Sequence, residues 1–190
     1  MSYQTYITEA IVCGSKNNMT SDKSYLLFTK DAGMLWATAR SVRLEKSKQR
    51  YALQDFSIIR VSLVKGKGGW RIGSVEAVGN PFMEACSRRA RGGVHSAMML
   101  LRRLVHGEEA NTNLYIDTVL ALTCMSVAEE SDIADLQDIF TLRLLHSLGY
   151  IAPQEAYEGL LTEADPWSVP TPVPSEAHQA IEKALTVSHL

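Results

Sequence analysis

The sequence contains few of the features that mark secreted, membrane-spanning or metal-binding proteins. Its three cysteines, Cys13, Cys86 and Cys124, lie far apart and form no CxxC pair, so we expect buried, reduced thiols. No apolar run approaches the roughly 20 residues that are needed to cross a bilayer. The N-terminus has neither the basic nor the apolar region of a secretory signal, which favours a cytoplasmic location.

Motifs for catalysis and cofactor binding are also missing. The five histidines show no HExxH or other metal-ligand spacing, and no cysteine pairs with them, so we expect no metal. The run from Lys65 to Gly69 is rich in glycine, but it lacks the GxxxxGK[ST] spacing of a Walker loop and is more typical of a hairpin turn. The chain has no GxSxG elbow either. We therefore predict a protein that is not an enzyme and that needs no cofactor.

The charged residues are divided unevenly along the chain, although the net charge is only −2. Residues 1–106 contain 17 Lys and Arg against 7 Asp and Glu, which gives +10. Residues 107–190 contain 2 Lys and Arg against 14 Asp and Glu, which gives −12. A basic half of this kind indicates contact with nucleic acid. The same division would also let the two halves attract one another across an internal interface.

The first eighty residues have the pattern of β structure. Apolar residues alternate most clearly with polar ones at Ile59, Val61 and Leu63. Strands are predicted at 6–12, 25–29, 34–39, 59–63 and 70–78, with a polar loop at 14–18. Five strands without a helical period between them predict a small closed barrel, which leaves no unpaired edge.

Helical periodicity begins at Asn80-Pro81, where Asn80 suits a cap and Pro81 suits a first turn. Gly92-Gly93 is expected to separate the first two helices. Helices are predicted at 82–90, 94–106, from near 113, from the N-cap Ser131 to the C-cap Gly149, at 154–161 and at 175–188. A Pro-rich segment at 165–174 is predicted to be extended. The predicted fold class is therefore α+β, with a barrel domain at 1–79 and a helical domain at 80–190 that includes the Pro-rich segment and a C-terminal helix.

The prediction of a binding site rests on a basic connection between the third and fourth strands, residues 39–50, in which five cations face one acid, Glu45. Taken alone, such a run is equally typical of a solvated loop. Small barrels, however, bind single strands by tracking phosphates with cations and stacking bases on aromatic rings. Tyr51 and Trp70 are the nearby aromatic residues, and both are expected to be partly packed rather than to stack on bases. The candidate DNA-binding residues are Arg40, Arg43, Lys46, Lys48, Arg50, Lys65, Lys67 and Arg71, with an extension to Arg88, Arg89, Arg91, Arg102 and Arg103.

Several runs of the sequence together resemble the bacterial RecO recombination mediators. The N-terminal runs are Leu26-Leu27-Phe28-Thr29, Gly33, Ala39-Arg40 through Arg43, Lys46-Ser47, Leu53-Gln54 and Phe56-Ser57. Tyr115-Ile116-Asp117 and the run from Phe140 to Tyr150 resemble two signatures of the helical domain of that family. The likeness extends from about Tyr6 to Tyr150. Ser41 stands where the family usually has glycine, and no cysteine follows Cys124 although many members carry a cysteine-rich zinc module there.

The resemblance implies an OB-fold barrel followed by a helical domain. It also implies a role in homologous-recombination repair, with binding of single- and double-stranded DNA, strand annealing, and loading of RecA without a nucleotide cofactor. The implied partners are DNA, RecR and single-strand-binding protein, with no membrane and no metal, in the cytoplasm at the nucleoid. The family's basic barrel face corresponds here to the cations of residues 40–50. The chain is shorter than usual for the family, and Asp135 and Asp138 lie beside the Phe140 run.

Two alternatives to the DNA-binding hypothesis use the same residues. A barrel of this architecture could act as a protein-interaction adaptor without mediator activity. It could also bind RNA, because stacking and phosphate contacts do not require DNA.

Overall fold

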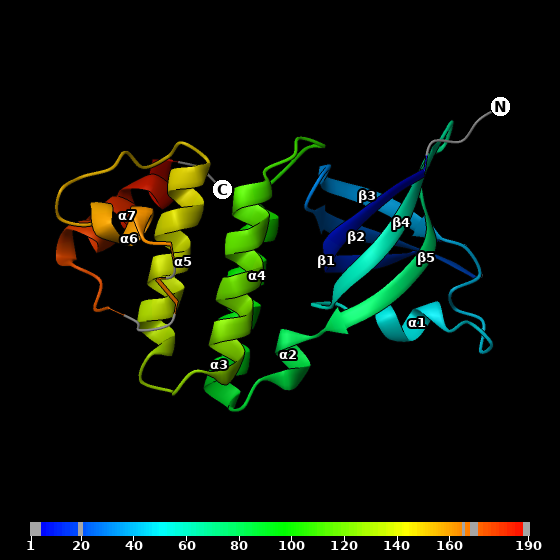
Figure 1. Ribbon diagram of the computed structural model, residues 1–190, viewed down its shortest axis with the longest axis horizontal. Helices are drawn as coiled ribbons and strands as arrows, with labels where there is room; N and C mark the ends of the chain where they lie inside the picture. Colours follow the sequence, from blue (N-terminus) through cyan, green and yellow to red (C-terminus); the bar gives the residue numbers. More distant parts are fainter. Residues whose placement is uncertain (1–4, 19–20, 165, 168–170, 188–190) are drawn as a thin grey trace. The chain divides into compact units, whose positions relative to one another are not determined.

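The computed structural model describes residues 5–18, 21–164, 166–167 and 171–187 (Figure 1). The chain divides into two compact units. The first comprises Met1–Pro81 and His106–Ile116, and the second comprises Phe82–Val105 and Asp117–Leu190. The domain boundary near Gly79 stays a prediction. Residues 165 and 168–170 of the expected Pro-rich segment, and Ser188 at the expected end of the last helix, lie outside the described residues.

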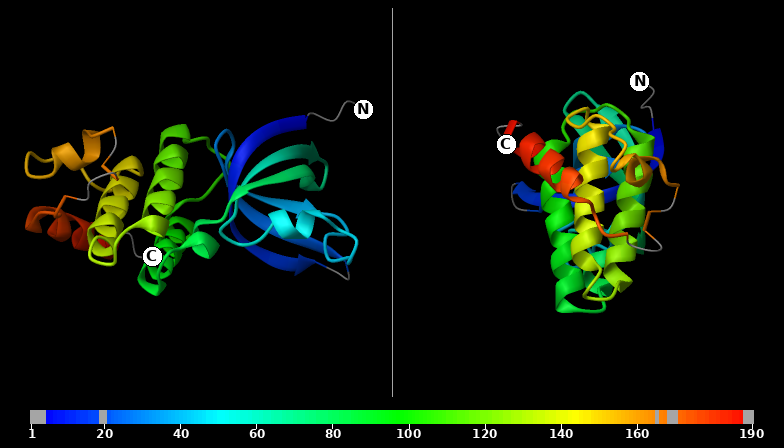
Figure 2. Two further views of the ribbon diagram at one scale, coloured as in Figure 1. Left: turned by 60° about the horizontal axis from the view of Figure 1, so that its bottom comes forward. Right: turned by 90° about the vertical axis from the view of Figure 1, so that its left-hand side faces the viewer.

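Five strands of the first unit form a closed barrel in the order β1-β2-β3-β5-β4 (Figure 2). They are β1 (Thr5–Asn18), β2 (Asp22–Thr29), β3 (Gly33–Ala39), β4 (Ile58–Gly66) and β5 (Gly69–Gly79). β1 pairs antiparallel with both β2 and β4, and a short parallel pairing of β3 with β5 completes the circle. The predicted OB-fold barrel is confirmed.

β1 is longer than the sequence predicted, because residues 14–18 continue the strand instead of forming a loop. The register shifts between Val12 and Gly14, which places a bulge at Cys13. A bulge bends a strand and increases its twist. The first half of β1 therefore pairs with β4 and the second half with β2. The polar composition of Lys16 and Asn17 reflects their exposure on a paired strand.

Side chains that point inward from all five strands fill the barrel. Ile59, Val61 and Leu63 are buried, which confirms the alternation predicted for β4. Tyr25 is 2% exposed among them, and burial, with a smaller effect of Asp55, raises its pKa to about 12. The barrel core therefore holds a neutral phenol, not a phenolate, at physiological pH.

Residues 106–116 belong to the barrel unit although they are distant from it in sequence. The backbone N–H of Met34 donates to the carbonyl of Gly107 at 2.9 Å. Gly33 has φ +66°, and a Cβ there would lie 2.7 Å from the same carbonyl. The ring of Tyr115 lies 5.7 Å from that of Phe28. Glycine at position 33 thus allows this segment to lie against the β2–β3 turn.

One short helix, α1 (Gln49–Ala52), belongs to the barrel unit, and the remaining helices follow β5. They are α2 (Pro81–Glu84), α3 (Arg88–Leu104), α4 (Thr112–Val127), α5 (Ile133–Ser147), α6 (Glu158–Thr162) and α7 (Ser175–Val187). None of the helices in the described part of the chain is long and apolar enough to span a membrane. Asn80, expected as a cap, donates its side-chain amide to the carbonyl of Asp55 and to Ser57 Oγ.

Several helix boundaries differ from the prediction. Asp132, not Ser131, occupies the N-cap of α5, and α6 is shorter than the expected 154–161 helix. Gly149, at φ +80°, follows α5 as predicted, in the left-handed conformation that suits glycine after a helix. The apolar stripe of α5 is buried from Ile133 to Leu144, which also agrees with the prediction.

The largest difference concerns Gly92-Gly93, which lies inside α3 and does not separate two helices. The side chain of Ser87 caps this helix by accepting a hydrogen bond from the backbone N–H of Ala90. A Cβ at position 93 would lie 2.9 Å from Cγ2 of Ile133 on α5, whereas one at position 92 would meet nothing within 4 Å. Gly93 is therefore explained by the close packing of α3 on α5.

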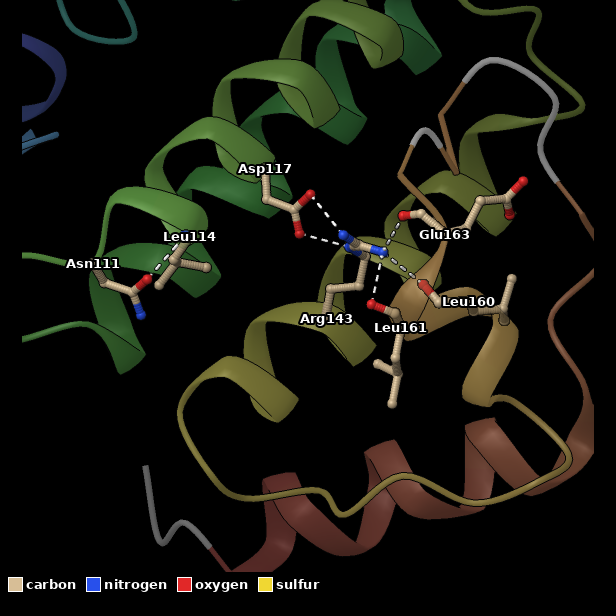
Figure 3. Close-up of polar contacts among 7 residues, drawn as sticks. All are labelled: Asn111, Leu114, Asp117, Arg143, Leu160, Leu161 and Glu163. Atoms are coloured by element: carbon tan, nitrogen blue, oxygen red, sulfur yellow. Dashed lines mark hydrogen bonds and ion pairs between the residues drawn. The ribbon is translucent and has the colours of Figure 1, made fainter.

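Arg143 on α5 joins three segments of the second unit (Figure 3). Its Nε and Nη2 donate to the carboxylate of Asp117 on α4 at 2.6 and 3.0 Å. Its Nη1 donates to the carbonyls of Leu160, Leu161 and Glu163 at the end of α6, at 2.8 to 3.2 Å. The side chains of Arg143 and Asp117 are only 14% and 20% exposed. A bidentate pair that is largely shielded from water fixes α4, α5 and α6 together.

The two adjacent glycines of α3 give a matched test of this packing. Gly92→Ala should stabilise the protein by about 1 kcal/mol, because alanine has the better helix propensity. Gly93→Ala should instead destabilise it by about 1–3 kcal/mol, because the buried Ile133 side chain must move. Urea unfolding followed by far-UV circular dichroism measures both, and equal effects of the two substitutions would contradict the packing described.

The Arg143 contacts predict a strong effect of a conservative change. Arg143→Lys keeps the charge but loses the planar fork, and should destabilise the second unit by about 3 kcal/mol. Lys183→Gln, an exposed change on α7, is the control and should change stability by less than about 0.5 kcal/mol. The measurement is urea unfolding, and a loss below 1 kcal/mol for Arg143→Lys would show that the network contributes little.

Candidate nucleic-acid interface

The outer face of β2 and β3 carries an exposed tryptophan beside a lysine. Trp36 on β3 alternates with the buried Leu35 and Ala37, and is 43% exposed. The Nζ of Lys16 on β1 lies 4.2 Å from the centre of its ring. Residues that are paired on neighbouring strands lie on the same face of a sheet. Ser24 on β2 pairs with Thr38 on β3, and Thr38 pairs with Arg71 on β5, so this face extends across the three strands.

We call this surface the β2–β3 outer face and define it by Lys16, Trp36, Thr38 and Arg71. Of these, the sequence had indicated only Arg71. The polar composition of residues 14–18 predicts a loop at Lys16, and the sequence does not distinguish the two faces of the strand that contains Trp36. Leu35, Ala37 and Ala39 are buried at every second position of the strand, and this alternation places Trp36 on the outward face.

The basic connection runs from Arg40 to Arg50 between β3 and β4, as predicted. Its members Arg40, Arg43, Lys46 and Lys48 are exposed, and Arg50 is half-buried. The backbone N–H of Ser41 donates to Oδ1 of Asp22 at 2.8 Å, and that of Arg43 donates to the carbonyl of Ser21 at 3.1 Å. The connection is thus fastened to the start of β2.

Ser41 adopts φ +53°, the left-handed conformation that glycine accepts without strain. The backbone at this position is therefore one that suits glycine, although the chain has serine there. The hydrogen bond to Asp22 offsets part of the conformational cost.

The second half of the connection forms α1, which packs on β5. Its Gln49 side chain donates to the carbonyl of Gly73. Arg50 lies over the ring of Tyr51 at 4.7 Å and donates to its hydroxyl at 2.6 Å. Tyr51 is 63% exposed and is not packed as the sequence had suggested. An exposed aromatic ring with a guanidinium held against it is available to a ligand.

At the turn between β4 and β5, one cation is paired with a carboxylate and two cations are exposed. Lys65 pairs with Glu108 at 3.0 Å and lies 4.7 Å above the ring of Trp70. The hydrogen bond from Lys65 lowers the pKa of the Glu108 carboxyl and thus favours its ionised form. Trp70 itself is 7% exposed, with Tyr6 edge-on at 5.4 Å, which confirms that it is packed. Lys67 and Arg71 are exposed.

The five arginines of the predicted extension lie on α3 in the second unit, and all are exposed. Three of them occupy the first turn, where the helix dipole disfavours cations, and two occupy the last turn, where it favours them. Arg91 donates from Nε to the carbonyl of Phe82 at 3.1 Å. α3 contains no acidic residue, and its positive charge is concentrated at its two ends, because no Lys or Arg lies between Arg91 and Arg102.

The described residues include no group of three or more His, Cys, Asp or Glu that could hold a metal ion. The arrangement on the barrel consists of cations, exposed rings and hydroxyl groups. Its chemistry is that of binding to an anionic, aromatic polymer.

No family model matches the chain. Among curated proteins, the chain is 30% identical over 146 residues to the DNA repair protein RecO of Caldanaerobacter subterraneus subsp. tengcongensis. It is 27% identical over 146 residues to the DNA repair protein RecO of Desulfitobacterium hafniense. These matches cover 76% of this chain, but 58% and 52% of the two relatives. The chain thus spans little more than half the length of the curated relatives that it matches.

Proposed function

Because the chain belongs to the RecO family, we propose that it acts in DNA repair by homologous recombination and that its barrel binds single-stranded DNA. The observation that carries the proposal is the β2–β3 outer face, where exposed Trp36 lies beside Lys16 and Arg71 shares the same surface. OB-fold barrels use the face of their second and third strands to bind oligonucleotides. An exposed ring stacks on an unpaired base, which a duplex does not offer.

The basic connection and the β4–β5 turn supply the phosphate contacts in this proposal. Arg40, Arg43, Lys46 and Lys48 are exposed on a connection that is fastened to β2. Arg50 and Arg71 add positive charge on α1 and β5, and Lys67 adds it at the turn. Lys65 contributes less than the others, because Glu108 already neutralises it.

The arginines of α3 provide a second basic surface, which we propose for contacts with duplex or with a second strand. Contact with two strands is what annealing requires. From the resemblance to the family, we also propose that the chain assists RecA loading, with RecR and single-strand-binding protein as partners. On the same ground we propose that it acts as a binding protein and not as an enzyme.

RNA binding and a role as a protein adaptor remain the competing functions. Competition between RNA and DNA strands of the same sequence separates the first from our proposal, since the barrel face carries no contact that demands DNA. The adaptor hypothesis requires that reversal of Arg43, Lys46 and Lys48 to glutamate leaves DNA binding unchanged while a protein partner is lost.

Fluorescence anisotropy with labelled oligothymidine across a salt series tests the proposal. If about six cations contact phosphates, log K should fall against log salt with a slope of roughly −4. Trp36→Ala should weaken binding about tenfold without changing the slope, because a stacked ring contributes roughly 1–3 kcal/mol per base. Lys46→Gln with Lys48→Gln should reduce the slope by about 1.4, since each phosphate contact on a single strand contributes about 0.7.

Arg60→Gln is the matched control for these variants, because Arg60 is an exposed cation of β4 that pairs with Glu76. Its affinity and salt slope should equal those of the unmodified chain. Binding no tighter than millimolar at low salt, or a slope near zero, would overturn the proposed function.

A further inference from the structure

A second basic feature of the barrel unit is a groove of about 510 Å³ at one end of the barrel. We call it the barrel-end groove. Its lining consists of Lys23, Tyr25, Val42, Arg43, Arg50, Leu53, Gln54 and Asp55. It lies apart from the β2–β3 outer face, because Tyr25 points into the barrel core.

The floor of the groove consists of buried side chains. Tyr25, Val42 and Leu53 line it and are each 2% exposed or less. Lys23 lies with its Nζ 5.3 Å from the centre of the Tyr25 ring. Since the floor belongs to the packed barrel core, the groove admits a ligand from one side only.

The cations of the groove come from three segments of the chain. Lys23 belongs to β2 and Arg50 belongs to α1. Arg43 belongs to the basic connection, where its backbone N–H donates a hydrogen bond to the carbonyl of Ser21. Asp55 is the one carboxylate in the lining, so the charged side chains there sum to +2. Because the pKa of Tyr25 is raised to about 12, its hydroxyl adds no negative charge to the groove.

The net charge of +2 in the groove favours one of the two kinds of phosphate in DNA. A phosphodiester within a strand carries one negative charge and continues into a nucleoside on either side. A phosphomonoester at a strand end carries a charge of about −1.5 to −2 at pH 7 and has three strong acceptor oxygens. The net charge of +2 in the groove matches the larger charge of the second, and charge-assisted hydrogen bonds to its oxygens are stronger than neutral ones.

We propose that the barrel-end groove binds the terminal phosphomonoester of a DNA strand whose bases lie on the β2–β3 outer face. The inference rests on the proposed function and adds preference for a phosphorylated end. Lys23 in the groove directly precedes Ser24, which bonds to Thr38 on the outer face at 3.2 Å. Neighbouring residues of β2 therefore connect the two sites, and one strand can reach both.

The test compares oligothymidine strands of one length, labelled at the opposite end, by fluorescence anisotropy. Their ends are a 5′-hydroxyl, a 5′-phosphate, a 5′-methylphosphate that carries a single negative charge, and a 3′-phosphate. The unmodified chain should bind one of the phosphomonoester ends about tenfold more tightly than the hydroxyl and methylphosphate ends. Comparison of the 5′- and 3′-phosphates identifies which end the groove prefers.

Lys23→Gln and Arg50→Gln should each reduce this tenfold preference to less than twofold. Lys48→Gln is the control, because it lies outside the lining and should weaken binding of all strands by the same factor, which preserves the preference. Circular dichroism should show that all three variants fold as the unmodified chain does.

Three outcomes would overturn the inference. If strands with hydroxyl and phosphate ends bind equally and with a normal salt slope, the groove has no role in end recognition but the proposed function stands. If the preference persists in both Lys23→Gln and Arg50→Gln, the end is recognised elsewhere. If no strand binds, the proposed function fails and the inference fails with it.

Discussion

The barrel depends on the short parallel pairing of β3 with β5, in which Ala37 lies opposite Trp70 and Thr38 opposite Arg71. Without it both strands would be open edges, which invite association with other chains. The pairing also separates β3 from β4, so the chain must cross β5 between them. Residues 40–57 make that crossing, and α1 packs on β5 as they do so. Topology thus requires a long connection at this place, whereas its five cations are not required by the fold and belong to the DNA-binding surface that we propose.

Much of the fold was predictable because it follows local patterns. The alternation in β4, the apolar stripe of α5 and the glycine that follows this helix can each be recognised from residues that are close together in the sequence. The prediction of a loop at residues 14–18 is wrong because a polar composition does not reveal strand pairing. The prediction of a break at Gly92-Gly93 is wrong because Gly93 packs closely against Ile133, which lies forty residues further along the chain.

The candidate site was predictable in its charge but not in its geometry. The basic connection was located correctly, since a charge run is visible in the sequence. The contributions of individual residues depend on contacts that only the fold creates. Lys65 is engaged by Glu108, Trp70 is packed, and Trp36 is the ring that faces outward beside Lys16. The barrel-end groove likewise combines residues from β2, the connection and α1.

The three tryptophans allow a direct test of whether DNA lies on the β2–β3 outer face. Trp36 is exposed on that face, whereas Trp70 lies in the barrel core and Trp167 is buried in the second unit. The indole N–H signals of the ¹⁵N-labelled chain should be followed by NMR as unlabelled single-stranded DNA is added. If DNA lies on this face, the Trp36 signal should shift and the Trp167 signal should stay in place. An unchanged Trp36 signal at saturating DNA would contradict DNA binding on this face.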